Sequence, residues 1–304
     1  MEGLTSPVAE PENKTGGEDR RNLSITGKKR GRRILVWGIV LAFLTISAAI
    51  AGSYRLTVGR YSLHVPGLRA VVRLLLIADL HSCRYGEKQA KLSRAIEAEK
   101  PDALMLVGDI ADDQIPIDGV EELLQAVTAD DKYPCFYVTG NHEFWSGRVE
   151  EIKQVFLNFG VAVLEGECVP LSVRGETLIV CGVDDPESGK FERQLKAVAD
   201  ETKSGGYSIL LSHRPERFRQ YVQGRFDLVL AGHAHGGLWR FPGLPGGLVA
   251  PNQGFFPKYT SGEYREQSTT MIVSRGLARE STRIPRFFNP VEIVVIDLLP
   301  EKGS

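Results

Sequence analysis

The chain has 304 residues, which is enough for one large domain and an appended segment. Its 37 Lys and Arg residues nearly balance its 38 Asp and Glu residues, so the overall charge argues against nucleic acid as a partner. Hydrophobic residues make up 42% of the chain, as in an ordinary globular protein.

The first 33 residues predict a disordered basic tail. Residues 1–27 are rich in Glu, Gly, Ser, Thr, Pro and Asn and show no apolar periodicity. Between Arg20 and Arg33 there are seven basic residues and no acidic one. Such a run next to a membrane segment sets its orientation and contacts anionic lipid more often than nucleic acid.

Residues 34–54 carry no charge and predict a transmembrane helix, because about 20 apolar residues span a ~30 Å hydrocarbon core. More basic residues precede this segment than follow it, which favours a single-pass protein of the cell membrane with an extracytoplasmic catalytic domain. Two alternatives stay open. Ala49-Ile50-Ala51 resembles a signal-peptidase site, and Arg32-Arg33 resembles part of a twin-arginine signal with poorly matching flanks. A buried core helix is disfavoured by the basic cluster.

Residues 55–70 predict a linker, and residues 71–300 predict the main domain. From Val71 onward, apolar strands alternate with segments of helical period, which indicates an α/β fold. The segment 236–257 is rich in Gly, Pro, Phe and Leu and predicts a long loop, and 270–274 and 291–298 predict late strands. The four cysteines have no Cys-x-x-Cys spacing; Cys135 and Cys181 lie in apolar runs, which favours buried thiols over disulfides.

Five apolar runs end in short polar motifs, and five of the six histidines lie in them. The motifs are Asp79-Leu80-His81, Gly108-Asp109, Gly140-Asn141-His142-Glu143, Ser212-His213 and Gly232-His233-Ala234-His235. Because sites in open α/β sheets gather beyond the carboxyl ends of strands, one fold can bring all five motifs into one cleft. The remaining histidine, His64, is expected at the surface, and Asp184-Asp185 favours a turn or helix cap over a place in the cleft.

These motifs supply imidazole, carboxylate and amide groups, a combination that suits Zn, Mn and Fe. An Asp can bridge two ions, and two ions roughly 3.5–4 Å apart would hold the attacking and leaving oxygens of a phosphoryl transfer, with hydroxide between them as nucleophile. The Gly before Asp109, Asn141 and His233 would let the backbone approach the ions. One such motif alone is usually structural, but five at strand ends predict a site.

In their order, the motifs resemble those of the calcineurin-like metallophosphoesterases, over about residues 71–299. More narrowly, the chain is similar to the membrane-attached bacterial phosphodiesterase-like subfamily, with supporting stretches at 232–237, 259–264, 273–276 and 286–290. Ala234 and Leu238 depart from its usual Thr and Gln, which bears on substrate preference and not on metal binding.

The resemblance implies a four-layer αββα sandwich and two divalent cations, Mn, Fe or Zn. It implies that Asp79, His81 and His235 hold the first ion, that Asn141, His213 and His233 hold the second, and that Asp109 bridges them. His142 would stabilise the transition state or protonate the leaving oxygen. Three arginines lie beside motif residues: Arg84, Arg214 and Arg240. One of them could bind the phosphate group of the substrate, but for each an ordinary solvated side chain is the favoured interpretation.

The expected function is hydrolysis of a phosphodiester or pyrophosphate bond. The membrane segment favours a lipid-linked substrate by proximity, and the resemblance implies one such as UDP-2,3-diacylglucosamine, on which some members of the similar subfamily act. That substrate lies on the cytoplasmic side, which conflicts with the expected orientation. The alternatives are a phosphomonoesterase or phosphoprotein phosphatase, and an inactive membrane-tethered binding module, which the complete ligand set disfavours. The expected partners are the phosphate ester and the membrane, with no nucleic acid and no obligate protein partner.

Overall fold

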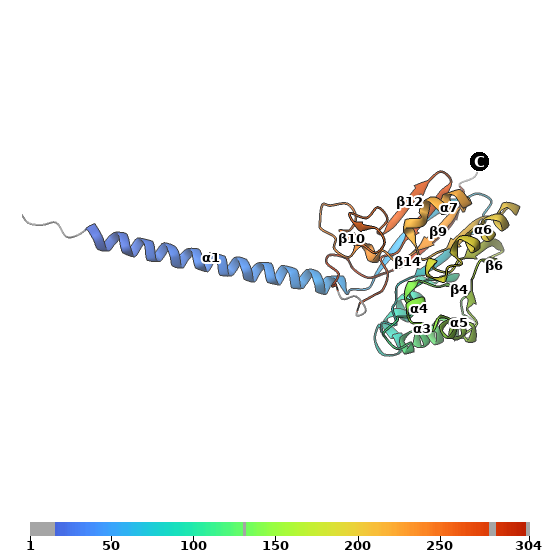
Figure 1. Cartoon of the computed structure of the whole chain (residues 1–304), viewed down its shortest axis with the longest axis horizontal. Helices are drawn as coiled ribbons and strands as arrows, with labels where there is room; N and C mark the ends of the chain where they lie inside the picture. Colours follow the sequence, from blue (N-terminus) through green and yellow to red (C-terminus); the bar gives the residue numbers. More distant parts are fainter. Residues whose placement is uncertain (1–15, 130–131, 280–283, 302–304) are drawn as a thin grey trace, which may run out of the picture. The chain divides into compact units, whose positions relative to one another are not determined.

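The computed structural model describes residues 16–129, 132–279 and 284–301. The chain divides into two units, residues 1–48 and residues 49–304, and each is described by itself. The first unit contains most of helix α1 (Gly16–Ser53) (Figure 1). The stretch Leu35–Ser53 is long and apolar enough to cross a membrane, and only 6% of its most apolar window is buried. A core helix would be mostly covered, so that alternative fails.

Helix α1 corrects the predicted disordered tail. Residues 1–15 of that tail lie outside the described residues, but the chain from Gly16 to Arg33 is helical and continuous with the apolar stretch. The physical reason is that extending a helix adds one hydrogen bond per residue, whereas starting one is costly. The prediction rests on a composition rich in Gly, Ser, Thr, Pro and Asn, but the Arg and Lys residues of this stretch are good helix formers.

The second unit is built on two mixed six-stranded sheets (Figure 1). The first consists, in spatial order, of β1 (Thr57–Val65), β14 (Glu292–Pro300), β2 (Val72–Ile77), β3 (Ala103–Val107), β4 (Cys135–Val138) and β5 (Ala162–Val163). The second consists of β12 (Gly262–Glu266), β13 (Thr269–Val273), β9 (Leu228–Ala231), β8 (Ser208–Leu211), β7 (Glu176–Gly182) and β6 (Glu167–Val173). A separate hairpin joins β10 (Val249–Ala250) to β11 (Gly254–Phe255). The expected late strands are therefore confirmed as β13 and β14.

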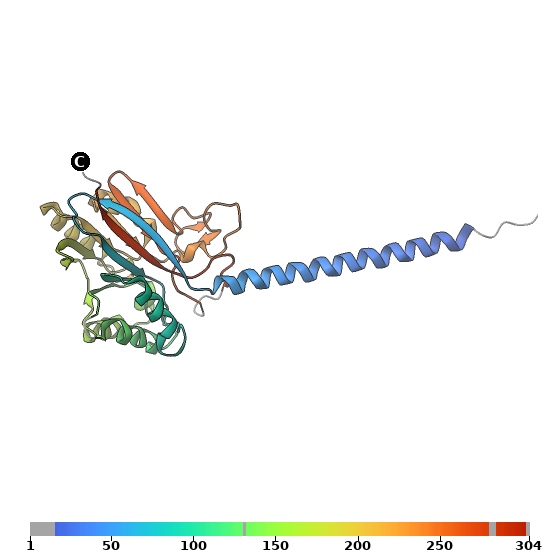
Figure 2. The ribbon, with the colours of Figure 1, turned by 180° about the vertical axis from the view of Figure 1, so that it is seen from behind.

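Strand β1 corrects the predicted linker at residues 55–70. It pairs in parallel with β14 over nine residues, from Thr57 opposite Glu292 to Val65 opposite Pro300, and Figure 2 shows the two strands side by side. Leu63 and Val65 point into the apolar layer between the two sheets and are buried there. Residues 57–65 form a strand because β14, from the far end of the chain, supplies the partner for pairing. The pairing lets Leu63 and Val65 face the buried layer.

Helices cover the outer face of each sheet, and the predicted four layers are confirmed. On the first sheet lie α2 (Ala90–Glu99), α3 (Asp118–Thr128) and α5 (Val149–Asn158), whose apolar side chains share one buried cluster with β2, β3 and β4. On the second sheet lie α6 (Phe191–Glu201) and α7 (Phe218–Gly224), which share another cluster with β7, β8, β9 and β13. A third cluster fills the space between the sheets. The short helices are α4 (Asn141–Trp145), η1 (Glu87–Gln89), η3 (Pro186–Ser188), η4 (Thr202–Ser204), η5 (Pro215–Arg217) and η6 (His235–Gly237).

A disulfide corrects the predicted thiol at Cys181. Cys168 on β6 stands directly opposite Cys181 on the antiparallel β7, and the two form a disulfide. The sequence does not reveal this bond because it depends on strand register. Cys135 is a buried free thiol, as expected.

Candidate metal centre

The strand-end motifs converge where the carboxyl ends of the parallel strands of the two sheets lie close together. Strands β2, β3 and β4 run parallel in the first sheet, and β8 and β9 run parallel in the second. Three groups of side chains each bring their nitrogen or oxygen atoms within 4.8 Å of one another. The groups are Asp79 with His81 and His235, Asp109 with His213 and His233, and His81 with Asp112 and His142. Side chains separated by more than 150 residues are thus in contact.

Five of the predicted ligands have a backbone that L-residues seldom adopt. Their φ angles are positive, at 51° for Asp79, 49° for His81, 49° for Asp109, 65° for His233 and 47° for His235. Each such residue costs on the order of 1–3 kcal/mol, and such strain collects at functional sites. The surrounding fold therefore holds these residues in place for a purpose other than stability.

All three motif glycines allow close approach, and a Cβ on Gly232 would lie 2.6 Å from Oδ2 of Asp79. Gly108 has φ +71°, and a Cβ there would lie 2.5 Å from Nδ1 of His213. A Cβ on Gly140 would lie 2.2 Å from Oδ1 of Asp109, although the backbone of Gly140 is extended. Gly108 thus provides both the sharp turn and the close approach that were expected, whereas Gly140 provides only close approach.

The imidazoles are oriented by hydrogen bonds on their outer nitrogens. His81 Nδ1 lies 2.9 Å from Asp112 Oδ2, and His213 Nδ1 lies 3.0 Å from the carbonyl oxygen of Val107. When each Nδ1 donates its proton outward, Nε2 is left with a lone pair toward the cluster. His81 Nε2 is then 3.7 Å and His213 Nε2 3.0 Å from Asp109 Oδ2. This places Asp109 between the two groups of ligands.

His233 is oriented in the opposite way. Its Nε2 lies 2.8 Å from Oδ1 of Asn252, which also accepts a hydrogen bond from Nη1 of Arg214 at 2.7 Å. Since that oxygen can only accept, it favours the tautomer with the proton on Nε2 and the lone pair on Nδ1, against the guanidinium Nη1 of Arg214, which lies 3.1 Å from the same Nε2 and can only donate. Nε2 of His235, in the other group, lies 3.7 Å from Oδ1 of Asp79.

The donor atoms themselves are buried and unsatisfied. Within the described residues, five side-chain atoms of the predicted ligands have no hydrogen-bond partner: His81 Nε2, Asp109 Oδ2, Asn141 Oδ1, His213 Nε2 and His233 Nδ1. His213 Nε2 and Asp109 Oδ2 face each other at 3.0 Å, but the other three atoms have no atom of the described residues within hydrogen-bonding distance. Since a buried polar atom without a partner costs about 1–3 kcal/mol, the cluster needs a ligand. Since all five can coordinate a cation and come from both sheets, the residues present fit a pair of divalent ions.

Charge in the cluster is shared unevenly among its titratable groups. Burial opposes the charged form of His213, but the neighbouring Asp109 outweighs burial and raises the pKa of His213 to about 10. Burial likewise opposes ionisation of Asp109, yet His213 holds the pKa of Asp109 well below its usual value. Burial lowers the pKa of His233 and of His235 well below the ordinary value, so both rings are neutral and ready to bind a cation.

Glu143 ties the motifs together. Its buried carboxylate accepts hydrogen bonds from the backbone N–H groups of Asp109, Ala111 and Gly140, at 2.8 to 3.0 Å. Burial, with the nearby Asp109, raises the pKa of Glu143 to about 7. Its place in the third motif marked it, but the sequence did not show that it joins the loops after β3 and β4.

His142 lies beside the cluster and is only partly buried. Its backbone N–H donates to Oδ1 of Asp109 at 2.8 Å, and its Nδ1 lies 2.5 Å from Oδ1 of Asp113. Its ring meets the ring of His81 edge-on, with 4.4 Å between the centroids. A histidine paired with a carboxylate at the rim of a site is suited to proton transfer.

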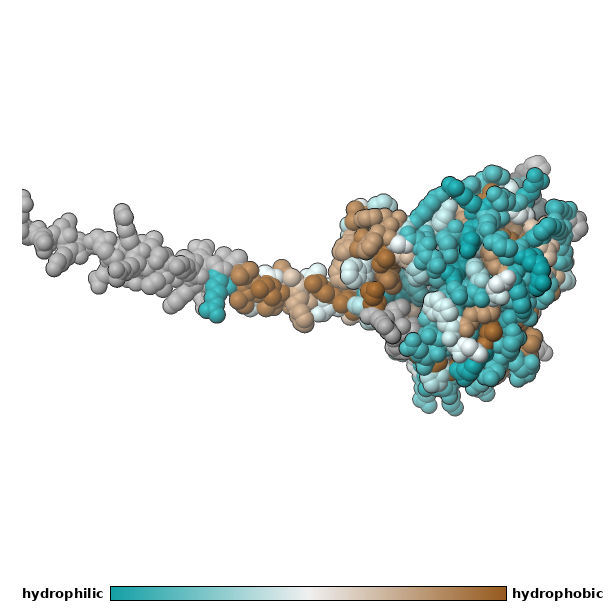
Figure 3. All heavy atoms as spheres, viewed as in Figure 1, coloured by the Kyte–Doolittle hydropathy of each residue, from teal (hydrophilic) through white to brown (hydrophobic). Residues whose placement is uncertain are grey.

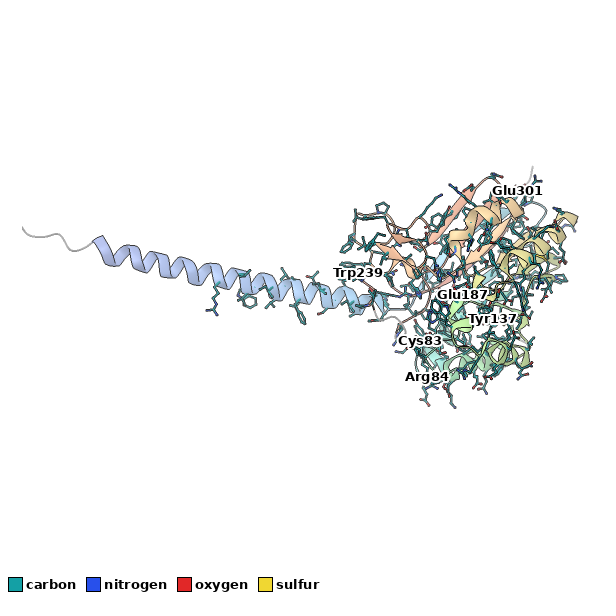
Figure 4. The ribbon with its side chains drawn as sticks, in the orientation of Figure 1. Cys83, Arg84, Tyr137, Glu187, Trp239 and Glu301 are labelled. Carbon is teal, nitrogen blue, oxygen red and sulfur yellow. A yellow bond between two sulfur atoms is a disulfide. The ribbon has the colours of Figure 1, made fainter. Side chains whose placement is uncertain are left out.

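The three arginines take different positions. Arg84 is exposed and forms an ion pair with Glu122 at 3.0 Å, and Figure 4 shows it at the edge of the domain. Arg214 is buried and makes two hydrogen bonds to Asp185, at 2.5 and 2.9 Å. Asp185 accordingly supports the site through Arg214, in addition to capping η3 as expected.

Arg240 is half-buried and donates to the carbonyl oxygen of Gly236 at 3.0 Å and to Oγ of Ser261 at 2.9 Å. These two hydrogen bonds use part of the donor capacity of the Arg240 guanidinium group. A substrate-binding role for Arg84, Arg214 or Arg240 stays a prediction.

Other residues at the site escaped the sequence reasoning. Asp112 and Asp113 follow Asp109 within four residues, and this run of three Asp residues could have indicated that they belong to the site. Arg286 is fully buried and donates to the carbonyl oxygen of Ala278, with Nη2 lying 3.4 Å from Nδ1 of His235. Asn252 lies in the β10–β11 turn, and no pattern in the sequence pointed to it.

Comparison with known proteins gives a consistent result. The profile of the family described as calcineurin-like phosphoesterase matches residues 72–237. The uncharacterized metallophosphoesterase YkuE of Bacillus subtilis is 31% identical, over 74% of this chain and 78% of its own length. An uncharacterized metallophosphoesterase of Campylobacter jejuni is 28% identical, over 87% of this chain and 69% of its own. A protein of Bos taurus named as a transmembrane protein with a metallophosphoesterase domain is 26% identical, over 55% of this chain and 40% of its own.

We expect cation affinity to rise with pH. The pKa of His213 is raised to about 10, so without a cation this ring is protonated at neutral pH, and a cation must displace the proton. Affinity for Mn²⁺ or Zn²⁺ should therefore rise about tenfold per pH unit between about pH 6 and pH 9 for one displaced proton. Calorimetric titration in buffers of different ionisation enthalpy measures both the affinity and the released proton.

The variant His64→Gln changes a histidine outside the cluster and should give the same curve. An affinity that does not change with pH, with no proton released, would contradict the assignment of His213 as a ligand.

Proposed function

Since the chain belongs to the calcineurin-like phosphoesterase family, we propose that this metal-dependent phosphoesterase hydrolyses phosphodiester or pyrophosphate bonds with two divalent ions, Mn, Fe or Zn. The observation that supports the proposal most strongly is the set of five buried donor atoms without partners. When bound, the two ions would activate the nucleophile and offset negative charge that develops on phosphorus oxygens.

We assign the ligands as follows. Asp79, His81 and His235 hold one ion, Asn141, His213 and His233 hold the other, and Asp109 lies between them. The 3.7 Å and 3.0 Å distances from Asp109 Oδ2 to His81 and His213 support the bridging position. Asp112 and the Val107 carbonyl group keep two of these rings in the tautomer that ligation needs.

His142 is the proposed proton donor to the leaving oxygen. Its pairing with Asp113 through Nδ1 orients the ring and leaves Nε2 for proton transfer. Its partial exposure, at 21% of the side chain, allows contact with a substrate that the buried ligands cannot reach.

The proposed substrate is a phosphate ester carried by a lipid. The helix Leu35–Ser53 supports this by proximity, if it is retained as an anchor. A phosphomonoester or a phosphoprotein is the alternative substrate. An inactive binding module is disfavoured because every predicted ligand is present in the fold.

We further propose that the catalytic domain faces away from the cytoplasm. The seven basic residues from Arg20 to Arg33 support this orientation, as does the disulfide between Cys168 and Cys181, because disulfides persist in oxidising compartments. The Bos taurus relative carries a transmembrane segment by name, which supports the retained anchor.

The activity is tested by replacing His142 with Gln. In the full chain in detergent with Mn²⁺, the wild type should turn over bis(p-nitrophenyl) phosphate faster than p-nitrophenyl phosphate. His142→Gln should lower kcat by about 10²- to 10⁴-fold, the usual contribution of a proton donor, with unchanged metal content.

The matched control is His64→Gln, which should keep wild-type kcat. Absence of turnover by the wild type on both esters, with Mn, Zn, Fe and Co each tried, would reject the function. Loss of metal from His142→Gln would instead make His142 a ligand.

Orientation is tested by adding protease to intact cells of the native host. The domain should be digested while a cytoplasmic marker survives, and an alkylating agent should label Cys168 and Cys181 only after reduction of their disulfide. A domain that resists protease until the cells are lysed would place it inside the cell.

A further inference from the structure

An exposed apolar patch lies on the domain, outside the metal centre. It consists of Trp239, Phe241, Leu244, Phe255, Phe256 and Phe288, and Phe255 and Phe256 are the most exposed, at 74% and 79%. Several of these residues line one shallow apolar hollow. Figure 3 shows brown surface gathered over the β10–β11 region, and Figure 4 shows Trp239 in the same region. Contiguous aromatic surface of this kind marks an interaction site.

The patch is one connected surface made from two chain segments. Trp239 Nε1 donates to the carbonyl oxygen of Pro285 at 3.0 Å. The backbone N–H of Arg240 donates to the carbonyl oxygen of Phe287 at 2.9 Å. The rings of Phe241 and Phe287 lie with centroids 5.7 Å apart. The segments 238–256 and 284–288 therefore present their aromatic side chains together.

The same surface is tied to the end of the apolar helix. Ser53 is the last residue of the stretch Leu35–Ser53. Its buried Oγ accepts a hydrogen bond from the backbone N–H of Asn289 at 3.0 Å, and its carbonyl oxygen accepts one from Val291 at 3.1 Å. Asn289 directly follows Phe288 of the patch. If the stretch spans a bilayer, Ser53 lies at the headgroup level, and the patch is held beside that level.

The charge around the patch also points to lipid. From Leu238 to Ser261 there is no Asp or Glu, and the charged residues are Arg240 and Lys258. From Ile284 to Pro290 the one charged residue is Arg286, which is fully buried, so the half-buried Arg240 and the exposed Lys258 are the basic groups beside the patch. Trp and Phe with basic and without acidic neighbours are the residues that settle at the headgroup boundary of anionic membranes.

We propose that this patch inserts into the headgroup boundary of the lipid bilayer and seats the catalytic domain on the membrane. The proposal rests on the retained anchor proposed above. Seating has a direct consequence for the metal centre, because both patch segments contact it. Asn252 in the β10–β11 turn bonds His233, and Asn289 Nδ2 donates to the carbonyl oxygen of His235 at 2.7 Å. The bilayer surface is thus kept at a constant distance from the candidate ligands.

Bromine-labelled lipid tests the proposal with the full chain. The chain has three Trp residues, so Trp37→Phe with Trp145→Phe leaves Trp239 as the one fluorophore. In vesicles of phosphatidylcholine and phosphatidylglycerol brominated near the headgroup end of the acyl chains, Trp239 emission should be at least about twofold lower than in unbrominated vesicles, because Trp at this boundary meets the bromines. Equal emission in both vesicles would overturn the proposal.

Three further variants separate the patch from the anchor. A chain with Trp37 alone should be quenched whenever the helix is inserted, so a quenched Trp37 with an unquenched Trp239 would reject the patch and keep the anchor. In the Trp239 chain, Phe255→Ser with Phe256→Ser should abolish at least half of the quenching, whereas Leu157→Ser, an exposed site on α5, should not. Quenching unchanged by the Phe255 and Phe256 substitutions would also overturn the proposal.

Discussion

The structure depends on one electrostatic constraint, which is that polar donor atoms are buried at the junction of two sheets without enough partners. Asp79, Asp109 and His213 are almost completely buried, and the donor atoms that face one another lack hydrogen bonds. Taking carboxylates out of water is costly unless an opposite charge compensates them. In the protein without cations, protons on His213 and His81 supply part of that compensation. Divalent cations supply it more completely, and the fold is arranged for them.

The rest of the architecture follows from this constraint. Parallel strands in both sheets deliver their carboxyl ends to one place, and the loops that follow are strained and tied by Glu143. Asp112, the Val107 carbonyl group and Asn252 then fix the ring nitrogens that face inward. The positive φ angles at five positions lower the stability of the fold, and the large apolar layers on both sides of each sheet offset that loss.

Much of this was predictable from the sequence, because apolar runs that end in Asp, Asn or His carry a local signal for both the strand and the ligand. The four layers follow from that signal, and so does the convergence of six of the seven expected ligands, which are Asp79, His81, Asp109, His213, His233 and His235. Features that depend on pairing between distant segments were not predictable. Strand β1 needs β14, and the disulfide needs the register of Cys168 against Cys181. Asn252 acts through a turn whose position only the folded chain determines.

The most direct measurement is an anomalous difference map from crystals of the protein soaked in Mn²⁺. Two peaks about 3.5–4 Å apart are predicted, one beside Asp79, His81 and His235 and one beside Asn141, His213 and His233, with Asp109 between them. A single peak, or two peaks away from these side chains, would contradict the account.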